Sequence, residues 1–430
     1  MSDESLKLAA DVRRCQRRLG SAPGARRSRI LERLAALLEE RREEILAANG
    51  EDLGLAAANR LAGPLLGRLE LSEAKLETLR QGVELLARQD DPIGRTVRRT
   101  ELDEGLMLRQ VRSPIGVLLI IFESRPDAVI QIGSLALRSG NGVILKGGSE
   151  ALCSNRVLVA CLRDAVAAEG LAAGAVAGVE GRDAVRALLD HDELIDLVIP
   201  RGSGELVRSI QSSTKIPVLC HAEGVCHLYL DATADPGMAA KLAVDGKCDY
   251  PSACNAVETL LVHRAFLPDL EGVARALNAE RVELRADAEA LPHCPGAKAA
   301  TEDDWGREYG DLVLAVRTVD DLDAAIDHIH RFGSAHTDAI VTGDPQAGRR
   351  FLDEVDSASV FVNASTRFAD GFRYGLGAEV GISTGRIHAR GPVGVEGLLT
   401  TRWLLVGSGQ GAADYGPGKR RFTHRSLPPE

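Results

Sequence analysis

The sequence is poor in aromatic residues and contains no long apolar run. Only 3% of its 430 residues are Phe, Trp or Tyr, so Ala, Leu, Val and Ile must build its core. The longest strongly apolar run, Gly116 to Phe122, is far shorter than the roughly 20 residues of a membrane-spanning helix. The N-terminal Met-Ser-Asp-Glu-Ser is polar and no apolar stretch follows it, which argues against a secretory signal. We therefore expect a cytoplasmic protein with no membrane partner.

The sequence also has no excess of basic over acidic residues. The 52 Lys and Arg residues are outnumbered by 62 Asp and Glu residues, and the formal net charge is −10. This excludes nucleic acid as the main partner, because binding to phosphate backbones needs a basic face. With 45% apolar and 27% charged residues, the composition is that of an ordinary folded protein and excludes extensive disorder.

Metal-binding patterns are missing as well. Eight cysteines in a long chain predict reduced thiols rather than a disulfide framework. Five residues separate the members of two cysteine pairs, Cys220 with Cys226 and Cys248 with Cys254. Structural zinc sites usually have about two to four residues between paired ligands, so we expect no metal site. His328 and His330 cannot share a helix face, and we expect them and His336 to be surface residues.

Apolar runs and helical patterns alternate from residue 115 onward, after N-terminal helices that we expect over residues 25–47 and 73–88. The first series has apolar runs at 115–122, 142–146, 195–199 and 227–230, with helical patterns at 128–138, 149–169, 182–190 and 203–212. The second series has runs at 258–263, 311–316, 338–342 and 359–362, with helical patterns at 266–278, 320–331 and 345–355. Strands that alternate with helices form parallel sheets covered on both faces. We therefore predict an α/β fold with two parallel-sheet domains.

Two further segments predict antiparallel strands. A hairpin turns at Glu104-Gly105 within residues 98–113, and a second apolar run extends from Leu398 to Val406. Exposed strand edges tend to be paired, so we expect these segments to join across subunits. Residues 416–430 predict a loose tail.

Two strand–helix turns carry residues suited to a phosphate-bearing ligand. The first, Leu145 to Glu150, combines two glycines, a helix start and Lys146 as a point charge. The second, Ile199 to Gly204, links another strand to a helix. Ligands bind outside the carboxyl ends of parallel strands, so two such turns in one sheet indicate a dinucleotide. Each turn is equally compatible with a plain connection, and the GxGxxG pattern of an ordinary Rossmann domain is absent.

A cysteine lies in a loop of small residues between the two series. Cys254 is in the stretch Tyr250-Pro-Ser-Ala-Cys-Asn-Ala256. Ligands often bind between domains, and a thiolate close to backbone amides is a strong nucleophile. The alternative is a buried structural cysteine, which is the usual fate of a free thiol. No histidine stands beside Cys254 as an obvious base, so a protease-like Cys–His pair is disfavoured.

Longer stretches around these residues resemble one enzyme family. They run from Ser113 to Pro126, Leu137 to Glu150, Leu197 to Ser203, Pro251 to His263, Ser359 to Phe368 and Gly377 to Pro392. They are similar to gamma-glutamyl phosphate reductases, the glutamate-5-semialdehyde dehydrogenases of the aldehyde dehydrogenase superfamily. The stretches Cys220 to Gly224 and Asp249 to Pro251 look most like the reductase half of pyrroline-5-carboxylate synthase. No kinase half is present, so we expect a stand-alone reductase.

The resemblance implies a role for individual residues. Cys254 is the implied nucleophile. Cofactor contacts are implied for Lys146, Ser149, Glu150, Gly202, Ser203 and Glu308, with Lys146 at the 2′-phosphate of NADPH and Glu308 at the nicotinamide ribose. Substrate contacts are implied for Ser124, Arg125, Asn363, Ser365 and Thr366. Ser124 stands where many relatives have an oxyanion-binding Asn, and Arg125 is suited to a phosphate.

The implied activity is the NADPH-dependent reduction of L-glutamyl 5-phosphate to L-glutamate 5-semialdehyde in proline biosynthesis, through a thioester on Cys254. Hydrolytic relatives activate water with a glutamate. Cys220 stands opposite that glutamate here and Glu223 is displaced by three positions, so we expect phosphate rather than water to release the thioester. Two alternatives stay open, namely an ordinary aldehyde dehydrogenase that forms an acid with water and an inactive dinucleotide-binding scaffold.

The implied architecture is that of the aldehyde dehydrogenases. The cofactor-binding domain would comprise residues 1–97 and 114–245, and the catalytic domain residues 246–390. Residues 98–113 and 391–415 would be oligomerisation elements, with a tail at 416–430. We expect a homo-oligomer of two or more chains, with a glutamate 5-kinase on a separate chain as a partner.

Overall fold

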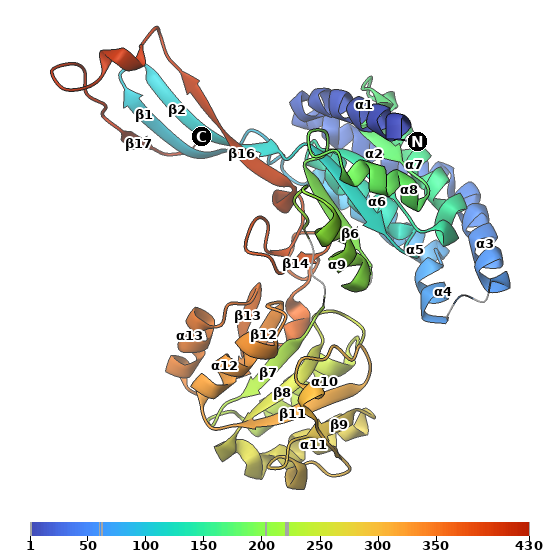
Figure 1. Cartoon of the computed structure of the whole chain (residues 1–430), viewed down its shortest axis with the longest axis vertical. Coiled ribbons are helices and arrows are strands. Elements are labelled where there is room, and N and C mark those ends of the chain that lie inside the picture. Colours follow the sequence, from blue (N-terminus) through green and yellow to red (C-terminus); the bar gives the residue numbers. More distant parts are fainter. Residues whose placement is uncertain (1, 60, 62, 203, 220–222, 430) are drawn as a thin grey trace.

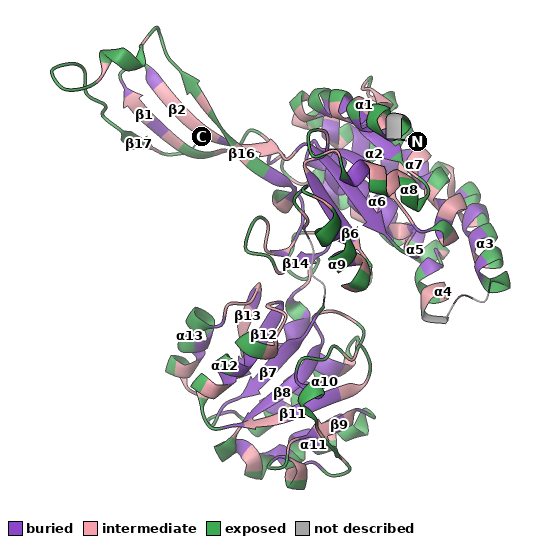
Figure 2. Ribbon diagram, in the orientation of Figure 1, coloured by how far each residue is buried: buried purple, intermediate pink, exposed green. Residues whose placement is uncertain are grey.

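A computed structural model describes residues 2–59, 61, 63–202, 204–219 and 223–429. It shows two α/β lobes, drawn one above the other in Figure 1, and a narrow antiparallel sheet that projects from the upper lobe. We call these parts the upper lobe, the lower lobe and the flap. Buried residues are concentrated in the two lobes, whereas most residues of the flap are exposed or of intermediate burial (Figure 2). No described helix is long and apolar enough to cross a membrane.

The upper lobe is built on four parallel strands in the order β5-β4-β3-β6. Its strands and connecting helices are β3 (Val117–Phe122), α6 (Asp127–Arg138), β4 (Gly142–Lys146), α7 (Leu152–Ala168), β5 (Val176–Gly178), α8 (Arg182–Leu189), β6 (Leu197–Arg201) and α9 (Gly204–Ser213). Every residue of β3 is buried, because helices cover both faces of the sheet. Leu118 and Ile120 face the core formed with α6 and α7, whereas Val117 and Leu119 face a second core that includes α8. This double burial explains the continuous apolar run in the sequence.

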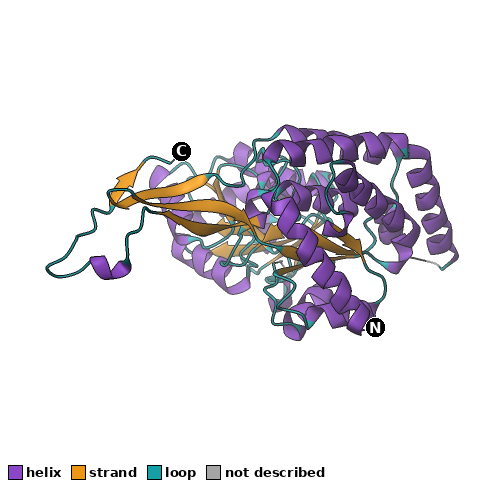
Figure 3. Cartoon of the chain, turned by 90° about the horizontal axis from the view of Figure 1, so that it is seen from above, coloured by secondary structure: helices purple, strands orange, loops and turns teal. Residues whose placement is uncertain are grey.

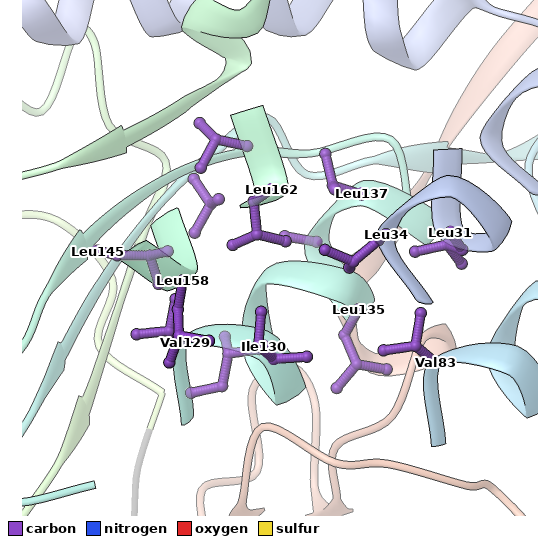
Figure 4. Packing of buried hydrophobic residues seen from close by; sticks show 14 of the residues in the cluster. Leu31, Leu34, Val83, Val129, Ile130, Leu135, Leu137, Leu145, Leu158 and Leu162 are labelled. Carbon is purple, nitrogen blue, oxygen red and sulfur yellow. The ribbon is translucent and has the colours of Figure 1, made fainter. Parts of the chain in front are cut away.

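Five helices precede the first strand. They are α1 (Ser2–Ser21), α2 (Gly24–Glu40), α3 (Arg42–Ala58), α4 (Gly63–Leu69) and α5 (Glu73–Arg88). Side chains from α2, α5, α6, α7 and β4 meet in one core (Figure 4). The single helix predicted over residues 25–47 is wrong, because the chain turns at Arg41 and α3 continues through Asn49. The buried Asn49 side chain bonds to the backbone of Leu69 and Leu71, at 3.0 and 2.8 Å, instead of ending the helix.

The lower lobe is built on seven parallel strands in the order β10-β9-β11-β8-β7-β12-β13. Its elements are β7 (Cys226–Leu230), α10 (Pro236–Cys248), β8 (Val257–His263), α11 (Leu270–Ala279), β9 (Glu283–Ala286), β10 (Lys298–Ala299), β11 (Val313–Val319), α12 (Leu322–Phe332), β12 (Thr337–Val341), α13 (Pro345–Glu354) and β13 (Ser359–Val362). One sheet face packs against α10 and α11, and the other against α12 and α13. The two parallel sheets predicted from the alternating pattern are therefore confirmed.

The predicted domain boundary at residue 246 is wrong for residues 226–245. Strand β7 pairs with β8 and β12, and α10 packs in the core of the lower lobe. The error has a physical cause, because a fully buried parallel strand has the same apolar pattern in either sheet.

The flap is an antiparallel sheet in the order β16-β2-β1-β17. Its strands are β1 (Thr96–Asp103), β2 (Leu106–Pro114), β16 (Leu399–Val406) and β17 (Arg425–Leu427). Seen from above, the flap extends away from the lobes (Figure 3). The predicted hairpin is present, but its strands pair with β16 and β17 of the same chain, and the predicted loose tail contributes β17. The edges left open belong to β16 and β17.

Between β13 and the flap, the chain returns to the upper lobe. This return segment, residues 377–398, contains the short strands β14 (Ile382–Ser383) and β15 (Gly391–Pro392). Val380, Val393 and Leu398 are buried in the same core as α6 and α7. Residues 391–398 therefore belong to the core of the upper lobe, although the sequence assigned them to oligomerisation.

Candidate active site

The strand ends of the upper sheet bring the two predicted turns to one edge. Lys146 ends β4 and Arg201 ends β6, and both strands pair in parallel with β3. Ser124 follows β3 at the same edge. Ligands of open α/β sheets bind at this carboxyl edge of the strands. Gly202 extends the second turn, whereas Ser203 lies outside the described residues.

Cys254 lies in the loop between α10 and β8, where its main chain is closely packed. The Cys226 thiol donates to the Cys254 carbonyl oxygen at 3.3 Å. A Cβ on Gly224 would collide with the same carbonyl, so this contact requires glycine. The next residue, Asn255, is buried and donates from Nδ2 to the Ala369 carbonyl at 2.9 Å. The loop that carries Cys254 is therefore held by β7, by Gly224 just ahead of β7 and by the loop after β13.

The surroundings of Cys254 set its protonation state. Burial raises the pKa of its thiol to about 11, Arg201 opposes this rise, and Glu379 and Glu308 add to it. The thiol is therefore protonated at neutral pH. The Arg201 side chain lies against Gly381, where a Cβ would collide with its guanidinium. Arg201 makes no ion pair with a carboxylate of the described residues, so its positive charge is available to a thiolate or to an anionic ligand.

The return segment from β13 places Glu379 and Gly381 against the end of β6. Glu379 accepts a hydrogen bond from the Gly371 N–H at 2.8 Å. Burial raises the pKa of Glu379, and the nearby Asp370 carboxylate raises it further. Arg201 therefore faces a carboxylate that is easier to protonate than an ordinary glutamate.

The turn after β4 is stabilised by its own glutamate. Oε1 of Glu150 accepts two hydrogen bonds from Ser124, from N–H and from Oγ–H, both at 2.6 Å. A Cβ on Gly148 would collide with the Glu150 carboxylate, so glycine leaves room for that side chain in its present position. Burial tends to raise the pKa of Glu150, but the bonds from Ser124 and the charge of Lys146 outweigh it and lower the pKa. The Ser124 hydroxyl is thus committed to Glu150, whereas the predicted role placed it at the substrate.

The chain is similar to known proteins over most of its length. Residues 3–290 match the model of the aldehyde dehydrogenase family. A gamma-glutamyl phosphate reductase from Synechococcus sp. is 53% identical over 427 residues, which cover 99% of this chain and 98% of that protein. One from Cyanothece sp. is 51% identical over 423 residues, 98% of each. The crystal structure of gamma-glutamyl phosphate reductase from Thermotoga maritima has a TM-score of 0.92 and 36% identity, covering 94% of this chain and 99% of that one.

The chain belongs to the gamma-glutamyl phosphate reductases of the aldehyde dehydrogenase family. This confirms the resemblance and the aldehyde-dehydrogenase-like fold expected from the sequence, and it makes the protein an oxidoreductase. Aldehyde dehydrogenases work with a nicotinamide cofactor. The bare backbone at Gly147 and Gly148, the cation of Lys146 and the second oxygen of Glu150 fit the phosphates and ribose of such a cofactor.

In this reductase-family chain, Glu308 is tied to the loop that precedes β7. Its carboxylate accepts a hydrogen bond from the N–H of Gly224, the residue that packs on Cys254. Partial burial raises the pKa of Glu308. Two residues after Glu308, the Gly310 N–H donates to the Glu258 carboxylate at 3.3 Å. Glu258 in turn forms an ion pair with Lys247 at 2.6 Å, and the side chains of Glu258 and Lys247 are fully buried. A buried ion pair thus supports the loop that carries Glu308.

The residues expected at the amino-acid end of the substrate form hydrogen bonds in the loop after β13 or are buried in it. The Asn363 amide bonds to both backbone groups of Thr342, at 2.9 Å each. Ser365 is buried and accepts from the Arg367 N–H at 3.3 Å, and Thr366 is fully buried. All three stabilise local structure here, so a contact with substrate stays a prediction for them.

The histidine prediction is wrong for two of three residues. His328 and His336 are buried, whereas His330 is exposed. His328 lies on the buried face of α12 together with Ala325 and Ile329, and His336 lies in the bend just before β12. Within the part of the chain that the structure describes, no group of His, Cys, Asp and Glu side chains is placed to hold a metal ion.

Sequence reasoning missed two charged residues near the thiol. Arg201 stands inside the predicted turn after β6, but its sequence context gives no sign that it faces Cys254. Glu379 lies in the matching stretch Gly377 to Pro392, and only the return of the chain to the upper lobe places it near Arg201.

Proposed function

We propose that this protein reduces L-glutamyl 5-phosphate to L-glutamate 5-semialdehyde and phosphate with NADPH, as a step of proline biosynthesis. The observation that carries the proposal is the Cys254 thiol near Arg201, a cation with no carboxylate partner among the described residues. A cysteine nucleophile beside a cation suits attack on an acyl group whose leaving group is an anion. The names of the relatives, gamma-glutamyl phosphate reductase, support the same substrate.

In the first step, the Cys254 sulfur attacks the acyl carbon of the substrate. A C–S bond forms, the C–O bond to the phosphate breaks, and the thiol proton leaves with the phosphate as HPO₄²⁻. This exchange balances without a basic side chain, which agrees with a thiol that is protonated at rest. Arg201 neutralises the departing phosphate, because a guanidinium binds phosphate oxygens through paired N–H donors.

Arg125 adds a second cation to this phosphate position. It follows Ser124, is partly exposed and bonds to Asp127 at the start of α6 at 2.9 Å. Besides burial, the charge of Arg125 lowers the pKa of Arg201, so the two guanidinium groups act on each other through space. An anion between two such cations relieves their repulsion, and this favours the acyl phosphate over a neutral aldehyde.

In the second step, the thioester is reduced. The cofactor, when bound, supplies the hydride, and Lys146, Glu150, Gly202 and Glu308 are the described residues that would hold it. The backbone N–H of Cys254 points toward its own sulfur and is the donor for the oxyanion. The C–S bond then breaks, the Cys254 sulfur takes up a proton, and the aldehyde leaves.

Glu223 is not placed to activate water for release of the thioester. Glu223, the acid displaced by three positions, is exposed and pairs with Arg208 on α9 at 2.9 Å. A general base must lie within about 2.6–3.2 Å of the proton it removes. Cys220, which stands opposite the water-activating glutamate, lies outside the described residues.

The test is the oxidative reaction with glutamate 5-semialdehyde and NADP⁺. In phosphate-free buffer we expect about one NADPH per active site followed by a slow steady rate, and sustained turnover after phosphate is added. Arg201→Gln should raise the KM for phosphate about tenfold or more, the size of a charge-assisted contact. As a matched control, Arg208→Gln frees Glu223 and should leave the phosphate-free rate unchanged. Equal steady rates with and without phosphate would identify a hydrolytic aldehyde dehydrogenase instead.

The open edge of the flap is the basis for a proposal about the oligomeric state of the chain. Trp403, Leu405 and Val406 are exposed on the edge strand β16, and we propose that this edge is covered by a second copy of the chain. Light scattering at several concentrations should show at least a dimer, and a stable particle of 45.8 kDa would contradict this proposal.

The proposed substrate and the proposed catalytic thiol indicate which partner enzyme and which compartment this reaction needs. An acyl phosphate arises by phosphoryl transfer to a carboxylate, so we propose that a glutamate 5-kinase on a separate chain supplies it. A catalytic cysteine must stay reduced, and this favours the cytoplasm.

A further inference from the structure

A second cationic pocket lies in the lower lobe, between β11 and α12. Its volume is about 320 Å³, and its lining includes Arg264, Arg317, Asp320, Asp327, His328 and Arg331. It shares no lining residue with the surroundings of Cys254. The pocket therefore raises a separate question of what its arginines bind.

Arg317 is held by aromatic rings rather than by an acid. Its guanidinium lies 5.1 Å from the Trp305 ring centroid and 5.6 Å from that of Phe332, and its Nη1 donates to His328 Nδ1 at 3.0 Å. The Arg331 guanidinium lies 4.8 Å from the centroid of the same Phe332 ring. Neither arginine pairs with a carboxylate among the residues that the structure describes. Two cations thus converge on one pocket with their charges unpaired.

Three arginines and two acids line the pocket, so the acids offset its positive charge only in part. Asp320 is bonded to Arg264 at 2.6 Å, and Glu289 also pairs with Arg264. Asp327 lies on the exposed side of α12. Arg264 is therefore neutralised, while Arg317 and Arg331 are not.

His328 adds a buried donor without an acceptor. Only 5% of this residue is exposed. An arginine can only donate, so Nδ1 of His328 must accept from Arg317 and Nε2 must carry the proton. That Nε2–H has no hydrogen-bond partner among the described residues. Burial and the charges of His227, Arg317 and Arg331 lower the pKa of His328 to about 2, so the ring is neutral at physiological pH.

We infer that this pocket binds a phosphate dianion, either free phosphate or the phosphate group of a small ester. Two guanidinium groups without a carboxylate partner among the described residues can hold one anion together, and their planar forks bind phosphate oxygens through paired N–H donors. The inference does not depend on the proposed function, because it involves none of the residues assigned to it.

The chain carries its own reporter for this site. It has two tryptophans, of which Trp305 is 4% exposed and contacts Arg317, whereas Trp403 is 52% exposed on the flap. In the Trp403→Phe variant, fluorescence therefore reports Trp305 alone. We expect a saturable change on titration with inorganic phosphate, or with methyl phosphate if an ester is preferred. Sodium chloride at the same ionic strength should give none.

Variants separate this pocket from the active site. In the same background, Arg331→Gln should weaken phosphate binding about tenfold or more, while Arg349→Gln, which removes an exposed arginine from α13, should not. Arg331 is exposed on a helix, so its substitution should not prevent folding, and far-ultraviolet circular dichroism checks this. A saturable change that survives Arg201→Gln supports the inference. Absence of a saturable change, a response only to acetate, or a response lost in Arg201→Gln but kept in Arg331→Gln would overturn it.

Discussion

Replacing Arg201 with glutamine should slow the reaction of Cys254 with a neutral disulfide reagent. Arg201 is the group that most opposes the rise of the Cys254 pKa, and glutamine removes its charge. Loss of a nearby opposite charge raises a thiol pKa by about one to two units. Because the pKa of Cys254 is already about 11, the thiolate fraction at neutral pH should then fall by the same factor, about 10- to 100-fold.

The observed decrease in rate should be smaller than the decrease in thiolate. A thiolate of higher pKa is more nucleophilic, with a Brønsted coefficient of about 0.4–0.5, and this recovers part of the loss. The net expectation is a rate lower by a factor of about 3 to 15. The reagent is uncharged dipyridyl disulfide, because a charged reagent could be attracted by Arg201 and its rate would then also report that attraction.

The assay must identify the modified thiol, because the chain has eight cysteines. After acid quenching and digestion, mass spectrometry of the Cys254 peptide gives the extent of mixed-disulfide formation. Between about pH 6.5 and 9 the rate should rise about tenfold per pH unit in both proteins, because both pKa values lie above this range. The two logarithmic plots should therefore be parallel.

Arg125→Gln is the matched control for this experiment. It removes a guanidinium from the same edge of the sheet, but one whose charge acts on Arg201 rather than on the thiol. Its Cys254 rate should stay within about twofold of the unaltered protein. Equal rates for Arg201→Gln and the unaltered protein, or a break in either plot below about pH 8, would refute the assigned electrostatics.

Further variants test the proposed catalytic cysteine, the proposed cofactor turn and the buried ion pair. Cys254→Ala should abolish turnover while NADPH binding, followed by cofactor fluorescence, survives; activity above a few per cent would show that no thioester is required. Lys146→Ala should reduce the preference for NADPH over NADH by about 10- to 100-fold in kcat/KM, and an unchanged ratio would place the 2′-phosphate elsewhere. Lys247→Met should lower the free energy of unfolding by about 3–5 kcal/mol, because it leaves the Glu258 carboxylate buried and unpaired. Burial already raises the pKa of Glu258 to about 7, so urea denaturation of that variant should show part of the loss regained as the pH falls and the carboxyl is protonated. The double variant with Glu258→Leu should recover most of the stability, and equal losses in the single and double variants would contradict this account.

The sequence by itself determined the fold class and two of the segments that form the candidate site. Strand and helix alternation predicted two parallel sheets, because a strand buried on both faces leaves a continuous apolar run that can be recognised locally. The turn after β4 and the loop around Cys254 were also found from the sequence, since glycines and small residues mark close approaches of the backbone. These features depend on neighbours along the chain.

Only the tertiary structure decided which of these parts meet. Cys254, Arg201 and Glu379 come from three distant segments, and Glu379 reaches Arg201 only because Val380 and Val393 bury themselves in the upper lobe. Likewise, β7 joined the lower sheet although its residues suit either one. Periodicity specifies which side of an element is buried but not which partner buries it. That choice depends on packing between residues remote in sequence, and such packing leaves no local pattern.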